Sequence, residues 1–443
     1  MGQPFCPSIF GEQKMTISNK HIDFTSNFVS FLNNLKPGKV TTSVEAPENP
    51  HVYDVWKVVD PVLAARPGLA PADAVVCIRL RIPFQEYLKG IEGLAQEVLK
   101  EAPEKPVWAT IQVMSRALEY YSKVPDFNPA FRPGFGHLNK MLDFLNHRNE
   151  PGYGQGYYGY GDAGCGKTNT LLWLASVLNM AVDSVNCSPT MVGDDLFVRQ
   201  MSEDGRWLSV EGPLLHAVRH GWWFLMDELD LAPCALPPSL NDLVEGHAYS
   251  VPGLKKAMIQ ANNNFRLFSF GNTGFAGAET GMYNGRSIVD TSFKSRCIVD
   301  KYSSLEAGVI MQMIRARFSV EEYSDELVEA TAAFAVSING AIKEGGIADT
   351  FGPRSVLQFV EAVVRNRGLQ HPLVYALTIA LPLVIDDEGF RETAWNLMVT
   401  CFASLVPLAG DIKEVWNDRE ARLNTDGLGG SDSSSSSDSD SAA

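Results

Sequence analysis

Apolar residues in the middle of the chain fall into short continuous runs that alternate with segments of helical spacing. Continuous runs of this length predict strands buried on both faces of a sheet. They lie at residues 155–160, 182–186, 222–226, 266–271 and 297–300. The segment 169–180 instead places apolar residues on one helix face. This alternation predicts an α/β domain over residues 131–302, with a parallel sheet sandwiched by helices.

The flanking regions have different patterns. Residues 303–423 keep helical spacing and predict a helical lid domain. Their most apolar run, 373–385, is too short to span a bilayer and contains Pro382, so it predicts a buried helix. Residues 1–130 predict a separate α+β domain of unknown function. The Ser- and Asp-rich tail, 424–443, predicts disorder because nothing from Gly429 onward can anchor a core.

The composition is that of an ordinary soluble protein, with a formal net charge of −15 and a pI near 5.0. Nucleic acids and anionic membranes are bound by an excess of Lys and Arg, so neither is expected as a partner, although a local basic pore stays possible. The seven cysteines form no C-x-x-C pair, which favours a reducing compartment over a disulfide framework or a zinc site. The chain starts without a leader sequence, and we expect it in the cytoplasm.

Residues 161–168 follow the first predicted strand and fit the phosphate-loop pattern G-x-x-x-x-G-K-[ST]. Glycines let backbone N–H groups turn toward phosphates, and the following helix directs its positive dipole end to them. Lys167 is expected to neutralise the β and γ phosphates, and Thr168 to bind Mg²⁺. A chance Gly-rich turn is the alternative, against which the order of strand, loop and helix argues. The predicted nucleotide-binding residues are Gly161, Asp162, Ala163, Gly164, Cys165, Gly166, Lys167 and Thr168.

Two carboxylates follow the third predicted strand, at the edge where α/β sheets bind ligands. Asp227 is expected to hold Mg²⁺ through its water shell, and Glu228 to orient and polarise the attacking water. Helix capping is the alternative for such a pair, but the upstream phosphate loop favours catalysis. For Asp230, on the same turn, capping or a subunit interface is favoured over metal binding.

The next predicted strand ends at Asn272, whose amide can hold a water beside the γ-phosphate; a simple turn residue is the alternative. Arg296 precedes the last predicted strand, and Arg354 begins a helical segment of the lid region. Arginine stabilises the charge that develops on a transferred phosphoryl group. A single Arg is commonly a surface residue, so these two assignments depend on a family resemblance.

The order of these motifs resembles the AAA+ ATPases, and more closely the MoxR group with the cobaltochelatase subunit CobS. The likeness covers about residues 154–359 and excludes residues 1–130 and the tail. Segments that follow CobS-like sequences in order are 265–268, 271–273, 280–285 and 295–299. The resemblance implies that Lys167 and Thr168 are the Walker A pair and that Asp227 and Glu228 are the Walker B pair. It further implies that Asn272 is sensor 1, Arg296 the arginine finger and Arg354 sensor 2.

The resemblance also implies an assembly. An arginine finger acts on the ATP of a neighbour, so a homo-oligomeric ring, most often hexameric, is expected. Ser295 stands where CobS-like sequences usually have Asp, and Lys294 and Arg286 are alternative fingers. A hairpin turned at Asp-Gly within 199–210 resembles the helix-2 insert of this group. The segment 248–265 resembles its pre-sensor hairpin, and such inserts face the ring pore or the client in relatives.

The leading hypothesis is an ATP-hydrolysing, Mg²⁺-dependent motor that remodels or activates a separate protein. The resemblance suggests metal insertion as one possible purpose of this remodelling, and a separate protein with a von Willebrand A domain as one possible partner. A nucleic-acid motor of the McrB or helicase-loader kind is the alternative; the acidic charge and the lack of a basic aromatic patch in residues 1–130 argue against it. A scaffold that binds ATP without hydrolysis is a further alternative, against which Glu228 argues. ATP and GTP are not distinguished.

Overall fold

The computed structural model describes residues 55–59, 75–89, 108–114, 123–128, 131–147, 156–203, 206–251, 258–262, 264–273, 286, 289–302, 306–345, 350–369, 372–381, 388–402 and 405. The predicted Asp204-Gly205 turn, the CobS-like segment 280–285 and the tail 424–443 lie outside these residues. The chain divides into two compact units, Met1–Leu305 and Glu306–Ala443, and each is described by itself.

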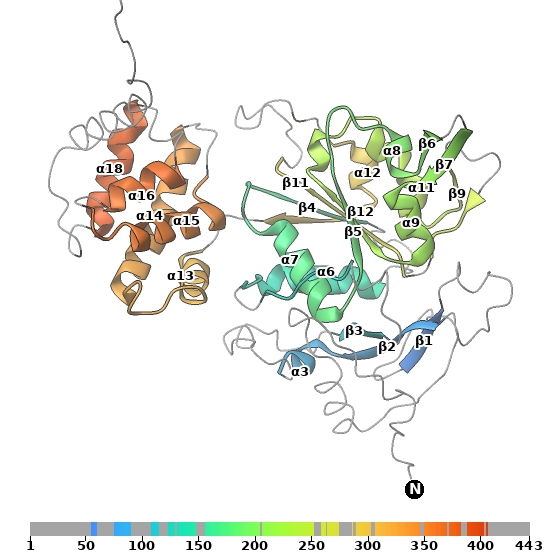
Figure 1. Ribbon diagram of the computed structural model, residues 1–443, viewed down its shortest axis with the longest axis horizontal. Helices are drawn as coiled ribbons and strands as arrows, with labels where there is room; N and C mark the ends of the chain where they lie inside the picture. Colours follow the sequence, from blue (N-terminus) through green and yellow to red (C-terminus); the bar gives the residue numbers. More distant parts are fainter. Residues whose placement is uncertain are drawn as a thin grey trace, which may run out of the picture. The chain divides into compact units, whose positions relative to one another are not determined.

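A five-stranded sheet in which every pairing is parallel forms the centre of the first unit (Figure 1). Its strands are, in spatial order, β12 (Cys297–Tyr302), β4 (Gly156–Gly161), β11 (Arg266–Gly271), β8 (Trp223–Asp227) and β5 (Val182–Asn186). These are the strands that the sequence predicts, so the α/β fold with a parallel sheet is confirmed. Because all strands run in one direction, their carboxyl ends share one edge, the carboxyl edge, and their amino ends share the opposite, amino edge.

Helices cover both faces of this sheet, because successive strand residues point to opposite sides. Tyr157 packs into a core cluster with residues of α6 (Phe135–His147) and α7 (Lys167–Leu178). Tyr158, the next residue, packs into a second cluster with α9 (Pro213–His220) and α11 (Asn241–Val244). Further short helices among the described residues around this sheet are α8 (Gly193–Leu196), the 3₁₀ turn η3 (Leu229–Leu231), α10 (Leu236–Ser239) and α12 (Thr291–Lys294).

Two small hairpins accompany the sheet. Strands β6 (Val198–Glu203) and β7 (Arg206–Glu211) pair antiparallel, as the sequence predicts, and Trp207 on β7 is 76% exposed. Strands β9 (Tyr249–Ser250) and β10 (Met258–Ile259) pair antiparallel within the segment predicted as a pre-sensor hairpin.

An antiparallel sheet of β1 (Val55–Val59), β2 (Val75–Pro83) and β3 (Trp108–Met114) precedes the parallel sheet along the chain. Helix α3 (Phe84–Lys89) follows β2 directly. Its Tyr87 hydroxyl donates to the Val177 carbonyl oxygen of α7 at 2.7 Å. Phe84 and Leu88 belong to the same core cluster as α6 and α7, so these N-terminal elements share a core with the α/β domain.

The described part of the second unit is helical. Its helices are α13 (Ala307–Arg315), α14 (Asp325–Gly345), α15 (Pro353–Arg365), α16 (Pro372–Ala380) and α18 (Glu388–Phe402). Four buried aromatic rings pack against one another between them: Phe334, Phe351, Phe359 and Phe402. Helix α16 lies in the apolar run predicted as a buried helix, and its Leu373 and Leu377 are buried. Among the described residues, no helix has the length and apolarity that crossing a membrane requires.

Candidate active site

The phosphate-loop motif connects the end of β4 to the start of α7, as its strand-loop-helix order predicts. Its glycines Gly161, Gly164 and Gly166 have φ values of 155°, 76° and 89°. A Cβ atom on Gly161 would lie 2.2 Å from the Tyr302 carbonyl oxygen of β12, a distance that no side chain could occupy. Glycine at this position is therefore required both by the backbone angle and by the neighbouring strand.

Lys167 is the first residue of α7, and its side chain is buried over the loop. Its Nζ donates to the carbonyl oxygens of Gly161 at 2.7 Å and Asp162 at 2.9 Å. It also donates to Asn272 Oδ1 at 3.0 Å. The predicted Walker A lysine and the predicted sensor 1 amide therefore meet at the carboxyl edge, although they are 105 residues apart in sequence.

Thr168 and Asp227 also meet there. The Thr168 hydroxyl donates to Asp227 Oδ2 at 2.8 Å, and the Glu228 backbone N–H donates to Asp227 Oδ1 at 3.0 Å. Hydroxyl and carboxylate oxygens form the donor set that Mg²⁺ prefers in phosphate-transfer sites. The residues present at this position thus fit a Mg²⁺ ion beside the phosphate loop.

Glu228 follows β8 directly and has a left-handed backbone, with φ 53° and ψ 44°. A non-glycine residue in this conformation costs of order 1–3 kcal/mol and is found preferentially at functional sites. The Glu228 side chain is 46% exposed, and Arg286 Nη2 lies 3.9 Å from its Oε1. The carboxylate is therefore accessible to a water molecule at the carboxyl edge, with a cation beside it.

Asp230 links the polar groups of this edge. It is fully buried, and its Oδ2 accepts hydrogen bonds from the backbone N–H groups of Asn272 at 3.0 Å and Thr273 at 2.9 Å. The Thr273 hydroxyl donates to the same oxygen at 2.9 Å, and Arg286 Nη1 donates to Oδ1 at 2.6 Å. The sequence interpretation favoured capping or an interface for Asp230. The structure shows that it fixes the end of β11 and pairs with Arg286.

A cysteine and a tyrosine beside these carboxylates are held in their neutral forms. Burial, with the charges of Asp227, Asp230 and Glu228, raises the pKa of Cys187 to about 12. Burial, followed by the charge of Asp230, raises the pKa of Tyr158 well above its usual value; its hydroxyl donates to the Thr273 carbonyl oxygen at 2.9 Å.

Cys165 in the phosphate loop is buried, and this burial raises the pKa of its thiol despite the nearby Lys167. The thiolate is the reactive form of cysteine. The raised pKa therefore indicates a small structural side chain at Cys165 and argues against a redox switch.

The predicted finger, Arg296, lies at the opposite edge of the sheet. Its carbonyl oxygen accepts from the Gly156 N–H at 3.2 Å, at the start of β4. The alternative fingers have other surroundings: Arg286 pairs with Asp230, and Lys294 is buried in α12. Arg354 belongs to the second unit, where it is an exposed residue in the first turn of α15. Its role as sensor 2 stays a prediction.

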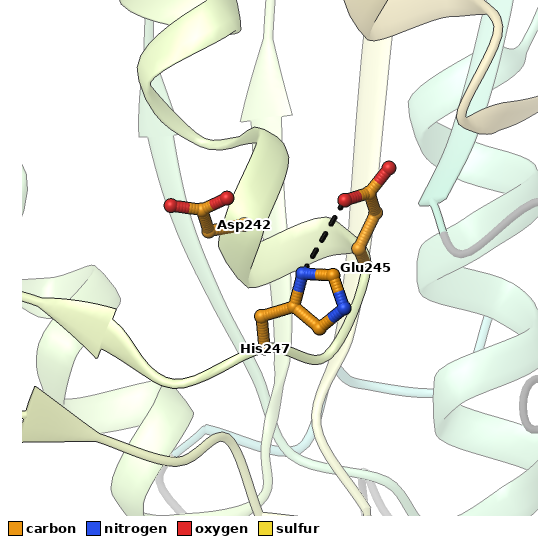
Figure 2. A group of neighbouring side chains, drawn as sticks. All are labelled: Asp242, Glu245 and His247. Atoms are coloured by element: carbon orange, nitrogen blue, oxygen red, sulfur yellow. Dashed lines mark ion pairs between the residues drawn. The ribbon is translucent and has the colours of Figure 1, made fainter.

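A second cluster of polar side chains lies at and after the end of α11. The ligand atoms of Asp242, Glu245 and His247 are within 4.8 Å of one another, and Figure 2 shows the ion pair of His247 with Glu245. The other carboxylate oxygen of Glu245, Oε1, accepts from Arg296 Nε at 2.6 Å. This cluster includes the ion partner of Arg296.

Comparisons with known proteins find a family match in the middle of the chain. Residues 160–297 match the AAA domain of the dynein-related subfamily. An uncharacterized protein of Staphylococcus epidermidis is 22% identical over 194 residues, which are 43% of this chain and 70% of that protein. Midasin of Dictyostelium discoideum is 27% identical over 137 residues, 31% of this chain but 2% of midasin. NtrX of Brucella abortus has a TM-score of 0.35 at 15% identity, covering 59% of this chain and 61% of that structure.

The family match and the sheet together identify an AAA+ P-loop NTPase fold, and they support nucleotide binding. The match begins at the end of β4 and ends at the start of β12, so it includes the phosphate loop, Asp227 and Asn272. The finer resemblance to the MoxR group and CobS stays a prediction.

Proposed function

We propose that this chain is a Mg²⁺-dependent ATPase that assembles as a ring of identical subunits and remodels or activates a separate protein. The observation that carries the proposal is the meeting of Lys167 with Asn272 and of Thr168 with Asp227 at one sheet edge. Phosphoryl transfer depends on positioning and on electrostatic stabilisation, and these residue types supply both.

The chain's own residues would hold the nucleotide and its ion. Lys167 would exchange the loop carbonyls that it now contacts for phosphate oxygens, and Thr168 and Asp227 would hold Mg²⁺. The ion, when bound, neutralises negative charge on the phosphates. Loop N–H groups at the start of α7 add the favourable end of a helix dipole.

Glu228 would act as the general base, because its carboxylate is accessible and can accept a proton from a water molecule. Asn272 would orient that water, since an amide both donates and accepts hydrogen bonds. Its backbone is held by Asp230, which fixes the end of β11 relative to Glu228. Hydrolysis by this arrangement distinguishes the proposal from a scaffold that only binds nucleotide.

Two further observations support assembly and action on a client protein. The position of Arg296 at the amino edge suits an action on a neighbour's nucleotide. The exposed β6–β7 hairpin, with Trp207 on its surface, suits contact with another protein. A MoxR-like or CobS-like role, metal insertion, and a client with a von Willebrand A domain are the finer options of this proposal. Net charge disfavours the nucleic-acid alternative.

Steady-state ATP hydrolysis by the full chain with Mg²⁺ tests the proposal. The Glu228→Gln variant should retain nucleotide binding and lose about 10²- to 10⁴-fold in kcat, because it lacks the general base. Glu329→Gln, at an exposed position of α14, is the matched control and should hydrolyse ATP like the wild type. Undiminished hydrolysis by Glu228→Gln would contradict the assigned base. Stimulation by DNA that fades with salt would contradict protein remodelling and favour a nucleic-acid motor.

A further inference from the structure

Arg296 is held in a defined position at the amino edge. Its Nε donates to Glu245 Oε1 at 2.6 Å, and its Nη1 donates to the Ser292 carbonyl oxygen at 2.7 Å. Arginine has five N–H donors. Among the residues that the structure describes, none accepts a hydrogen bond from Nη2. The Arg296 side chain is 31% exposed, so the remaining donors are accessible from outside the chain.

This position is remote from the chain's own phosphate loop. Strand β12 starts directly after Arg296 and pairs in register with β4, from Cys297 opposite Gly156 to Tyr302 opposite Gly161. A strand rises about 3.3 Å per residue, so roughly 16 Å separate these two ends of the pairing. The Arg296 guanidinium is anchored at the far end, out of reach of a phosphate held by this chain's own loop.

Glu245 is itself anchored to the same edge. It follows α11 directly, and its backbone N–H donates to the Asn241 carbonyl oxygen at 2.9 Å. The preceding residue, Val244, is buried, and its side chain lies 3.3 Å from where a Cβ of Gly156 would be. The second carboxylate oxygen of Glu245 lies 3.4 Å from His247 Nδ1 (Figure 2). The Glu245 carboxylate therefore has few alternative positions.

We propose that Glu245 is the positioning residue for Arg296, holding its guanidinium so that the remaining N–H donors meet the nucleotide of a neighbouring subunit. The inference rests on the proposed function, because it requires hydrolysis in an assembly. The two alternative fingers do not compete for the role: Arg286 is bound to Asp230 at the carboxyl edge, and Lys294 is buried. A long side chain held at two points loses less rotational freedom when it binds a phosphate.

The test compares Glu245→Ala, Arg296→Ala and the double variant in steady-state ATP hydrolysis by the full chain. Arg296→Ala should lower kcat by about 10³-fold or more, the range of arginine fingers. Glu245→Ala should lower kcat by about 10- to 100-fold with KM nearly unchanged, as expected for a misplaced group. The double variant should be no slower than Arg296→Ala alone, because one residue acts through the other. Glu245→Gln keeps an acceptor oxygen and should regain part of the rate.

Mixing experiments separate positioning in a neighbour from support of the same chain. Glu245→Ala has an intact phosphate loop, whereas Lys167→Ala has an intact Arg296 and Glu245. A mixture of the two should hydrolyse ATP several-fold faster than the sum of the separate proteins. Glu329→Ala mixed with Lys167→Ala is the matched control for subunit exchange, and Glu245→Gln replaces Glu245→Ala if the latter does not fold.

The outcomes distinguish the inference from the proposed function. If Glu245→Ala and Glu245→Gln hydrolyse ATP like the wild type while Arg296→Ala is slow, Glu245 does not position Arg296 and the ATPase proposal stands. The inference also fails, alone, if Arg296→Ala keeps the full rate, or if the mixture shows no gain over its components. A wild-type chain that does not hydrolyse ATP would overturn both.

Discussion

The two edges of the central sheet differ in how their polar groups are satisfied. At the carboxyl edge, Lys167, Thr168 and Asp230 each bond to residues from another strand or loop, and Asp230 is fully buried. At the amino edge, Arg296 and Glu245 form one ion pair in which each side chain is about one third exposed. The hydrogen bonds described at the carboxyl edge are made within one chain, whereas the amino edge leaves a cation accessible to a second molecule.

This difference indicates where activity can arise. A network of buried, mutually satisfied groups resists displacement and preorganises the residues around a phosphate. An exposed ion pair contributes little to stability, commonly about 0–1 kcal/mol. Stability alone therefore gives little reason for the pairing of Arg296 with Glu245, which agrees with the role between subunits proposed above. The following predictions, from the largest expected effect to the smallest, test this division.

Lys167→Ala should abolish the activity of the carboxyl edge. The variant removes the cation for the phosphates and the link to Asn272, so nucleotide binding and hydrolysis should fall below detection. Binding of a fluorescent ATP analogue and steady-state hydrolysis measure both effects. Lys301→Ala removes an exposed lysine of β12 and is the matched control. Hydrolysis that persists in Lys167→Ala would show that this edge is not the nucleotide site.

The sequence predicts the parts of this edge that depend on local order. Parallel strands place their carboxyl ends together, so Lys167, Asp227 and Asn272 could be assigned from motif and strand position. The pairing of Asp230 with Arg286, which the resemblance offers only as an alternative finger, does not follow from the sequence, because the two residues meet across 56 residues and no local pattern records their pairing. The only sequence feature that points to a role for Asp230 is its place as an acidic residue on the turn after the Walker B pair.

The amino edge is harder to predict for the same reason. The resemblance points to Arg296, but its partner Glu245 lies 51 residues earlier, before the β9–β10 hairpin, strand β11 and helix α12. Short helices and two-residue strands carry little periodicity, so the fold of 241–259 could be placed only in outline. The contact depends on tertiary packing of α11 against the start of β4, which the sequence pattern does not encode.

Asp230→Asn should weaken the carboxyl edge without abolishing binding. The amide keeps the volume of the carboxylate but loses its charge, and it presents N–H groups toward donors from Asn272, Thr273 and Arg286. We expect kcat to fall by about 10- to 100-fold, the scale of a misplaced catalytic group. The affinity for nucleotide should change less, because Lys167 and the loop are untouched. Unchanged kcat would show that Asp230 has only a structural role.

Strand β12 runs between the two edges. In its middle, the buried Asp300 pairs with polar side chains that have a structural role. Its oxygens lie 2.6 Å from His137 Nδ1 and 2.5 Å from Lys140 Nζ, both of α6, and accept from the Tyr157 hydroxyl at 2.6 Å. Burial alone would raise the pKa of Asp300. The hydrogen bonds from His137, Lys140 and Tyr157 outweigh it and hold the pKa below the usual value.

Asp300→Asn should therefore affect stability more than chemistry. A carboxyl whose pKa is lower in the folded chain stabilises the fold above its unfolded pKa of about 3.9, and this contribution is lost as the pH falls through the lower folded value. At pH 7 the variant should lose about 1–3 kcal/mol of unfolding free energy, the scale of hydrogen bonds to a charged group. Its stability should also depend less on pH below about 4 than that of the wild type. Urea unfolding at a series of pH values measures both effects.

Because Asp300 contacts α6 and not the carboxyl edge, hydrolysis by the folded variant should stay within about threefold of the wild type, well above the rate of Asp230→Asn. A loss of kcat as large as that of Asp230→Asn would mean that β12 transmits its packing to the phosphate loop, and that the two edges of the sheet do not act separately.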